Sequence, residues 1–228
     1  MHERDDRQAG GRSEPGLAGA SARAEYERRS ACDAARRRAK FGRLAPVVQL
    51  LAGPRPTTEA WGRGAEGEEL VGRRIESVIG SDGVALHDRR IPGHRGNLDH
   101  LVVAATGVWV IDAKHYHGRL ARKQAGGWFA PRAVLTIARR DESRLIAAAR
   151  RQRATVEAVL DPDIPTRAVL CFTGVDLPLL ARPFVIDDVL VTWLAALART
   201  LCAPGPLGPT QRGAVADRLA HAFPPYRR

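Results

Sequence analysis

Residues 97–114, NLDHLVVAATGVWVIDAK, carry the clearest structural pattern in this chain of 228 residues. Two runs rich in β-branched side chains flank Thr106 and Gly107, which predicts a β-hairpin with a two-residue turn. Before the hairpin, residues 64–80 place apolar side chains at helical spacing and end on a glycine. After it, we expect a helix over about residues 141–160 and then a buried strand, RAVLCFT. This order predicts an α/β fold in which helices flank a mixed sheet.

The alternation of side chains along the hairpin brings charged residues together. With this turn, Asp99 lies opposite Lys114, and Leu101 lies opposite Asp112. Asp99, Asp112 and Lys114 then point to one face of the hairpin. A loop longer by two residues keeps this arrangement, whereas a one-residue bulge would break it. We therefore expect two acids and a lysine at the open end of the hairpin.

The preceding helix offers a third acid, Glu68. Its side chain lies on the same side of the predicted helix as Val71 and Ile75, the side that must pack against the sheet. A carboxylate in such a position costs free energy unless something pairs with it. Glu68 therefore needs a cation, a metal ion or a hydrogen-bond network beside it.

Three carboxylates and one lysine match what metal-assisted phosphodiester hydrolysis requires. Mg²⁺ or Mn²⁺ binds a few carboxylate oxygens, here those of Glu68, Asp99 and Asp112, and keeps waters that can serve as the nucleophile. Lys114 can orient or help deprotonate such a water, or stabilise the charge that develops on the phosphate. Arginine would take a proton poorly, which would explain a lysine in a chain with 33 Arg and three Lys. A structural salt bridge among the hairpin residues explains the same spacing equally well.

Composition narrows the class of partner. The formal net charge of +11 favours polyanions, with nucleic acid first, although general solubility accounts for it as well. Cys32, Cys171 and Cys202 are far apart without CxxC spacing, so a reducing cytoplasm fits better than a disulfide framework or a zinc cluster. No segment resembles a signal peptide or is apolar over a length that spans a bilayer, which predicts a cytoplasmic protein without a membrane partner. The sequence contains neither GxGxxG nor GxxxxGK[ST], which argues against dinucleotide and P-loop chemistry.

These elements resemble the nuclease-related domain (NERD), a branch of the PD-(D/E)XK nuclease superfamily. The pattern GxxGE in residues 64–68, the DH pair that begins at Asp99, and VIDAK at residues 110–114 occur in the order found in that family. An Arg- and Ala-rich helix carrying Gln152 follows, and the flanking segments are similar to those of actinobacterial members. The resemblance covers residues 61 to about 173 and implies a restriction-endonuclease-like fold.

The resemblance also implies a set of site residues. Glu68 matches the acid on the family's helix, and Asp99 matches its central acid. Asp112 matches the second acid, Lys114 matches the lysine, and Gln152 matches a glutamine on the next helix that lines the site. Asp112 stands where most members carry glutamate, and its shorter side chain could shift the geometry of a bound metal.

The function expected from the sequence is a Mg²⁺-dependent nuclease acting on DNA. The alternative is a non-catalytic module on the same fold that binds nucleic acid or a partner. A zinc protein built on His115 and His117 is a third hypothesis, although their spacing fits no established zinc signature. The expected organisation is disorder over residues 1–21, a helical extension and linker over 22–60, the nuclease-like domain over 61–173, and helices and loops packed on it over 174–228.

Overall fold

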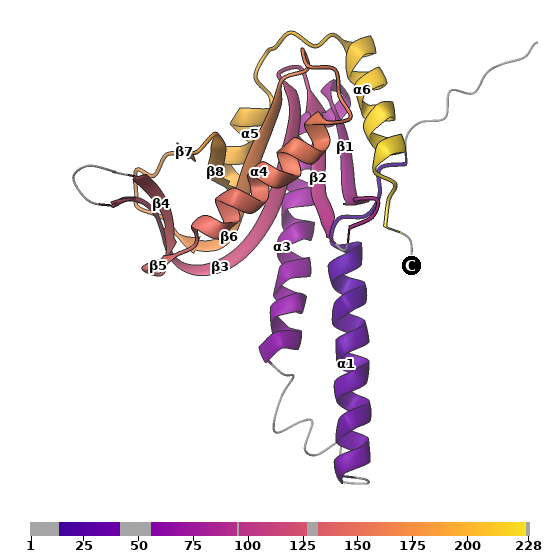
Figure 1. Cartoon of the computed structure of the whole chain (residues 1–228), viewed down its shortest axis with the longest axis vertical. Coiled ribbons are helices and arrows are strands. Elements are labelled where there is room, and N and C mark those ends of the chain that lie inside the picture. The colour runs from indigo at the N-terminus through magenta and orange to yellow at the C-terminus, as the bar shows by residue number, and fades with distance from the viewer. Residues whose placement is uncertain (1–13, 42–55, 95, 127–131, 227–228) are drawn as a thin grey trace, which may run out of the picture.

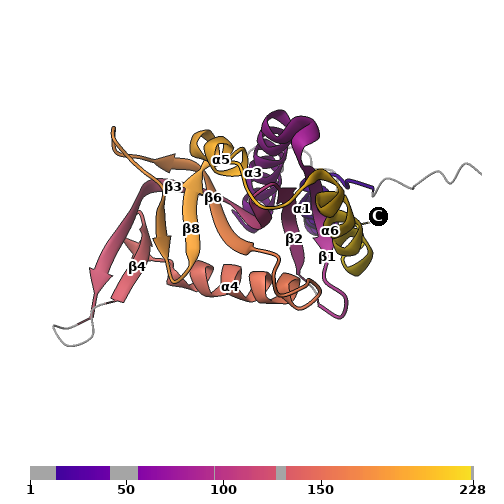
Figure 2. The ribbon, with the colours of Figure 1, turned by 90° about the horizontal axis from the view of Figure 1, so that it is seen from above.

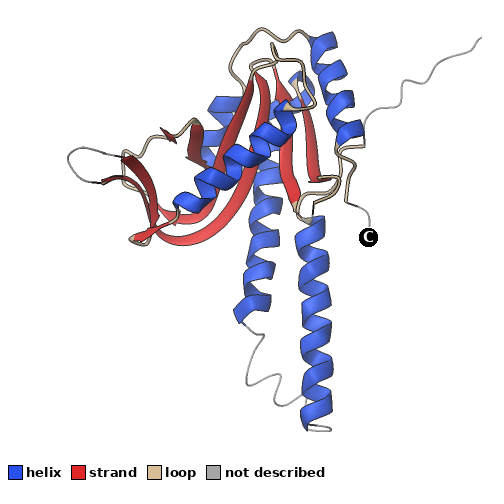
Figure 3. Cartoon of the chain, viewed as in Figure 1, coloured by secondary structure: helices blue, strands red, loops and turns tan. Residues whose placement is uncertain are grey.

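A computed structural model describes residues 14–41, 56–94, 96–126 and 132–226 of the chain (Figure 1). Its helices are α1 (Ala20–Phe41), α3 (Pro56–Ile79), the short 3-10 helix η2 (Gly80–Asp82), α4 (Ser143–Glu157), α5 (Leu194–Leu201) and α6 (Pro209–Ala222). Its strands are β1 (Val84–Arg90), β2 (Asn97–Ala104), β3 (Gly107–Ala125), β4 (Arg132–Ile137), β5 (Arg140–Asp141), β6 (Thr166–Asp176), β7 (Phe184–Ile186) and β8 (Val189–Trp193). Figure 3 shows the helices arranged around the strands.

The strands form one mixed sheet in which β1, β2, β3, β6, β8 and β7 are neighbours in that order. β1, β2 and β3 pair antiparallel, β6 and β8 run parallel to β3, and β7 returns antiparallel to β8. β4 pairs with the distal part of β3, and β5 pairs with β4. The predicted α/β fold, a mixed sheet flanked by helices with a helix on its N-terminal side, is confirmed.

Helices cover both faces of the sheet (Figure 2). On one face, Ile75 of α3 packs with Val102 of β2, and α5 lies in the same apolar cluster. On the other face, Val156 of α4 and Leu219 of α6 pack with Val110 of β3. Both faces of the hairpin are therefore buried, which explains its nearly continuous apolar sequence. None of the helices in the described part of the chain is long and apolar enough to cross a membrane.

α1 and α3 lie side by side, run in opposite directions and extend beyond the sheet (Figure 1). The sequence predicts a linker over residues 54–61, whereas α3 already begins at Pro56. Proline is tolerated in the first helical turn because a backbone N–H there has no intrahelical partner. The short packing helix expected over residues 44–53 lies outside the described residues.

Asp88 of β1 holds the start of α1 on the sheet. Its carboxylate is buried and accepts hydrogen bonds from the Ser21 N–H (2.5 Å), the Ser21 hydroxyl (2.8 Å) and the Asn97 side-chain amide (2.8 Å). A carboxylate at this position satisfies backbone donors that a helix start leaves without partners. The prediction of disorder extends to residue 21, whereas Ser21 and Pro15, whose carbonyl accepts from the His87 N–H (2.7 Å), have defined contacts with β1.

Replacing Asp88 with alanine should lower the free energy of unfolding by about 2 kcal/mol, because three hydrogen-bond donors lose their acceptor. Ser21→Ala removes only one of these bonds and should cost about 1 kcal/mol. Urea denaturation followed by circular dichroism measures both values. Equal stability of Asp88→Ala and the wild type would show that this carboxylate does not anchor α1.

The sequence predicts a strand pair formed by GRLARK (residues 118–123) and GWFAP, and the first of these is part of β3, whereas the strands after residue 173 differ from the prediction. β3 continues without interruption to Ala125, and its partner is β4, while the GWFAP segment expected to pair with it (residues 127–131) lies outside the described residues. The segment after residue 173 was expected to hold helices and loops, but β7 and β8 lie there and complete the sheet. Both short strands follow turns rich in proline or aspartate, so their apolar runs are brief and give a weak periodic signal.

Candidate active site

The β2–β3 hairpin closes with a register that differs by two residues from the predicted one. Ala104 pairs with Gly107, so the turn consists of Ala105 and Thr106. Gly107 is the first residue of β3 and has a φ of 125°. A Cβ at this position would lie 2.2 Å from the Pro165 carbonyl oxygen. Glycine is therefore required here for the close approach of another segment, and its place in the sequence was misread as a turn position.

The new register corrects the predicted pairs across the hairpin. Leu101 lies opposite Val110 and not Asp112, and Asp99 does not pair with Lys114. Because the shift is two residues, each side chain keeps its predicted face of the strand. The predicted grouping of Asp99 with Asp112 thus survives the error in register.

Asp99 lies where β2 and β3 stop pairing. The ladder ends with His100 opposite Ile111, and beyond it the Ala113 N–H donates to Asp99 Oδ2 (2.9 Å). On its other side, β3 is held by β6, with Asp112 next to Leu170. A buried backbone N–H without an acceptor is costly, so the Asp99 carboxylate takes the place of the missing strand partner.

Asp112 and Lys114 form an ion pair on β3. The Lys114 ammonium donates to Asp112 Oδ1 and, at 3.3 Å, to the Ala113 carbonyl oxygen. The Asp112 side chain is 3% exposed and that of Lys114 is 25% exposed. A buried carboxylate is tolerated when it is paired, and the partly open lysine leaves one side of this pair accessible.

Glu68 approaches the same residues from α3. The preceding Gly67 is buried, and a Cβ there would lie 3.1 Å from both His115 Cβ and Thr173 Oγ1. The glycine of the GxxGE pattern thus lets α3 lie close to β3 and β6. Glu68 itself is half-buried, and the charges of Asp112 and Lys114 act on it.

The carboxyl groups influence one another strongly. Burial raises the pKa of Glu68 to about 7, and the charges of Asp88 and Asp112 add to this rise while Lys114 opposes it. Burial also raises the pKa of Asp99 well above its usual range, with further contributions from the charges of Glu68 and Asp112. When all are ionised, these acids have too little positive charge beside them. This acidic cluster, formed by Glu68, Asp99 and Asp112, therefore favours an added proton or an added cation.

Lys114 holds its proton firmly in this arrangement. Burial alone would lower the pKa of Lys114, but the charges of Asp112 and Asp99, and the hydrogen bond with Asp112, outweigh burial and raise it above its usual value. A protonated lysine can donate hydrogen bonds and stabilise negative charge, but it cannot take a proton from water. Of the roles expected from the sequence, this state fits charge stabilisation.

The oxygen donors of this cluster suit a hard divalent cation, but their present arrangement is not a finished metal site. Within the described residues, no group of three or more His, Cys, Asp or Glu side chains is placed to hold a metal ion. Lys114 engages one oxygen of Asp112, and the Ala113 N–H engages one oxygen of Asp99. The carboxyl groups of Asp99 and Asp112 also share a hydrogen bond with each other, which contributes to the raised pKa of Asp99. Carboxylates without nitrogen or sulfur ligands suit Mg²⁺ or Mn²⁺ better than zinc.

Gln152 lies on α4 between Ala149 and Val156, two residues buried against the sheet. Its side chain is half-buried, on the helix face turned toward the strands. In the part of the chain that the structure describes, no hydrogen bond joins Gln152 to the acidic cluster. Its predicted place in the site therefore stays a prediction.

Two features beside the cluster were not predicted. Asp88 acts on Glu68 by its charge, yet in the sequence it is one of several polar residues at the end of β1 and gives no separate signal. His87 and His100 are buried with their Nδ1 atoms 2.9 Å apart, so one nitrogen must accept and at least one ring is neutral. Burial lowers the pKa of both histidines.

The model of the nuclease-related domain family, NERD, matches residues 63–173. The matched segment includes the whole acidic cluster and Gln152, and it ends on β6, the strand that supports Asp112 and Lys114. Neither the curated proteins nor the solved structures contain a match to the chain. The matched segment contains the part of α3 that carries Glu68, and the β2–β3 hairpin that carries Asp99, Asp112 and Lys114. Residues 63–173 of this chain are a nuclease-related domain.

Proposed function

We propose that this protein is a metal-dependent nuclease that hydrolyses phosphodiester bonds in DNA. One observation carries the proposal: acids from α3, β2 and β3 converge on one lysine within a nuclease-related domain. Partly buried acids that repel one another destabilise a fold, so stability alone does not account for them. The residues proposed for the active site are Glu68, Asp99, Asp112, Lys114 and Gln152.

Mg²⁺ or Mn²⁺ is the cofactor that this cluster suits. Glu68, Asp99 and Asp112 would hold it, because they supply oxygen donors and have too little positive charge beside them when all three are ionised. The bound ion would supply Lewis-acid polarisation of the phosphate and a water of lowered pKa. Small side-chain movements are needed, since one oxygen of Asp112 is engaged by Lys114 in this structure.

The protein's own groups have distinct parts in this proposal. Lys114 donates to a non-bridging phosphate oxygen and stabilises the charge that builds up there. Asp112 orients the Lys114 ammonium through their ion pair. Asp99 fixes the spacing of β2 and β3 through Ala113, and Gln152 contacts the substrate or its water from α4.

DNA as substrate and the cytoplasm as location are parts of the same proposal. The formal net charge of +11 supports a polyanionic substrate. The three cysteines are all free, with Cys32 and Cys202 exposed, as in proteins of a reducing compartment.

Replacing Lys114 with alanine should slow Mg²⁺-dependent cleavage of plasmid and linear DNA by about 100-fold or more, because a donor to the developing charge is lost. Lys40→Ala on α1 is the matched control, as it removes a lysine from an exposed position outside the matched domain. Cleavage rates in Mg²⁺ and in Mn²⁺ provide the measurement. Equal rates for the wild type and Lys114→Ala would remove Lys114 from the active site.

A non-catalytic module that binds nucleic acid is the second candidate. It is favoured by the ion pair that occupies Asp112 and by the absence, among the described residues, of three ligands already placed around a metal. Isothermal titration calorimetry with Mg²⁺ and Mn²⁺ separates the two candidates. Salt-sensitive DNA binding without any metal binding would favour the module over the enzyme.

A further inference from the structure

The strand that carries Asp112 and Lys114 continues into a basic two-stranded ribbon, formed by residues 118–125 of β3 and by β4 (Figure 1). We propose that this basic ribbon binds the phosphate backbone of DNA to one side of the active site, several nucleotides from the reacting phosphate. The inference rests on the proposed function, because it assigns a second contact surface for the same substrate.

Positive charge is concentrated in this part of the chain. Residues 117–153 contain ten basic and two acidic side chains, a formal net charge of +8 out of +11 for the whole chain. The ribbon itself has no acidic side chain among residues 118–125 and 132–137. Its four basic residues are Arg119, Arg122, Lys123 and Arg132, all exposed.

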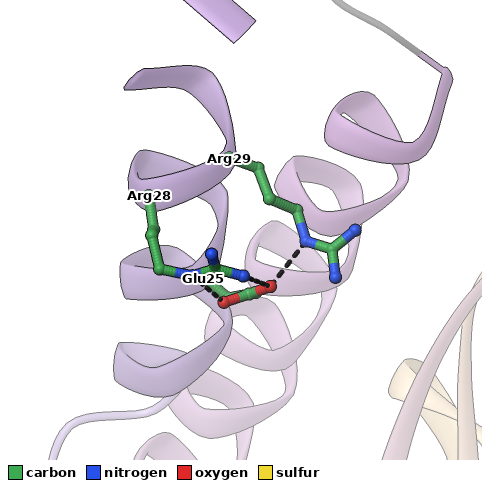
Figure 4. Close-up of polar contacts among 3 residues, drawn as sticks. All are labelled: Glu25, Arg28 and Arg29. Carbon is green, nitrogen blue, oxygen red and sulfur yellow. Dashed lines mark hydrogen bonds and ion pairs between the residues drawn. The ribbon is translucent and has the colours of Figure 1, made fainter. Parts of the chain in front are cut away.

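Ion pairs distinguish the β3 half of the ribbon from two arginines of α1, although Asp176 of β6 lies next to Arg119 in the sheet and Asp141 interacts with Arg132 by its charge. Among the described residues, no acidic side chain forms an ion pair with the three basic residues of the β3 half of the ribbon. On α1, by contrast, Glu25 lies between Arg28 and Arg29 and pairs with both, at 2.6 Å in each case (Figure 4). An exposed cation without a partner exerts its full field on a polyanion, whereas a paired one is largely compensated.

The path of β3 sets the distance between these cations and the active site. The pairing of β3 with β6 shifts register between His115 and Gly118, and a bulge of this kind bends a strand. At about 3.3 Å per residue, Arg119 and Lys123 lie at most about 17 Å and 30 Å along the strand from Lys114. Since phosphates of one DNA strand follow one another every 3.4 Å or so along the axis, the contacts fall about five to nine nucleotides from the reacting phosphate.

The ribbon is attached firmly enough to act as a fixed surface. Leu120 of β3 and Leu135 and Ile137 of β4 are buried in one apolar cluster with Leu145 and Ile146 of α4. These contacts hold the ribbon to the helix that also carries Gln152. Because its basic side chains are exposed and its apolar ones are buried, the charges can be removed without opening the core.

Fluorescence anisotropy of a labelled duplex of about 30 base pairs, roughly 100 Å long, tests the proposal in EDTA, where no cleavage occurs. The variant is Arg119→Ala with Arg122→Ala and Lys123→Ala, and binding is measured over a series of salt concentrations. We expect the slope of log K against log salt to become shallower by about 2 to 3, since about 0.9 is lost for each phosphate contact. Arg119→Lys with Arg122→Lys keeps the charges and should keep the slope.

The matched control removes the same number of positive charges from α1, through Arg36→Ala, Arg38→Ala and Lys40→Ala, and should leave the slope unchanged. An unchanged slope in the ribbon variant, with its melting temperature preserved, overturns the proposal. Equal effects of the two triple variants overturn it too, since the charge would then act diffusely. If the wild type cleaves DNA and the ribbon variant keeps the wild-type slope, only the proposed role of the ribbon is refuted. A ribbon effect without any cleavage would refute only the proposed nuclease activity.

Discussion

Replacing Asp112 with asparagine should lower the single-turnover rate of metal-dependent DNA cleavage by about 1,000-fold or more, because it removes the negative charge that the cation needs. Asparagine has nearly the same size as aspartate and retains an oxygen that can accept from Lys114, so the buried pair of β3 keeps its shape. The change therefore acts on charge with little effect on packing.

Asp82→Asn is the matched control, since Asp82 is exposed in η2 and lies outside the acidic cluster. Calorimetric titration of Mn²⁺ into each variant should show weakened binding only in Asp112→Asn. Circular dichroism and the melting temperature report whether the fold is retained. A folded Asp112→Asn protein that cleaves DNA as fast as the wild type would show that Asp112 is not a metal ligand.

The side on which each site residue lies could be predicted from the sequence, because alternation along a strand and the helical period of α3 are local properties. The partner of each residue could not, since it depends on where the hairpin turns. The local pattern indicates a turn at Gly107, but the Pro165 carbonyl, 58 positions away in the sequence, requires the glycine there. A contact at that distance along the chain leaves no trace in the local pattern.

The residues of the acidic cluster could be predicted from the sequence, but the residues and strands around it could not. Asp88 affects Glu68 because α3 packs beside β1, which brings the charge of Asp88 near the Glu68 carboxyl group. The strands β7 and β8 are too short to give a periodic signal, although they complete the sheet next to β6. Tertiary contacts decide both features, and one sequence read by itself does not contain them.

The metal-free protein should become more stable at about pH 8 when Glu68 is replaced with glutamine, by up to about 3 kcal/mol, with little change at about pH 5. The pKa of Glu68 is about 7 in the folded protein, against 4.5 for the ordinary side chain. Between these values the folded protein keeps a proton that the unfolded chain has released. The contribution of Glu68 to the free energy of unfolding therefore falls as the pH rises from about 4.5, and it levels off above about 7.

Two buried histidines act in the opposite sense and must be separated from this effect. Because burial lowers the pKa of His87 and His100, the unfolded chain takes up protons below about pH 6.5 that the folded protein resists, and stability falls in acid. These histidines are present in every variant, so their contribution cancels when variants are compared at one pH. Glu66→Gln serves as the matched control, since Glu66 is exposed two residues before Glu68 on α3. Urea denaturation over a pH series gives the required free energies.

Addition of Mg²⁺ should reverse the order of stability if the strain on Glu68 reflects a cation site. Binding needs ionised carboxylates, so Mg²⁺ should raise the melting temperature of the wild type more at about pH 8 than at about pH 6. Glu68→Gln lacks one of the proposed ligands and should respond weakly at both values. Equal stabilities of Glu68→Gln and Glu66→Gln at pH 8 would mean that Glu68 bears no electrostatic strain. The acidic cluster would then be explained by the Asp112–Lys114 ion pair alone, and the case for a metal would lose its physical basis.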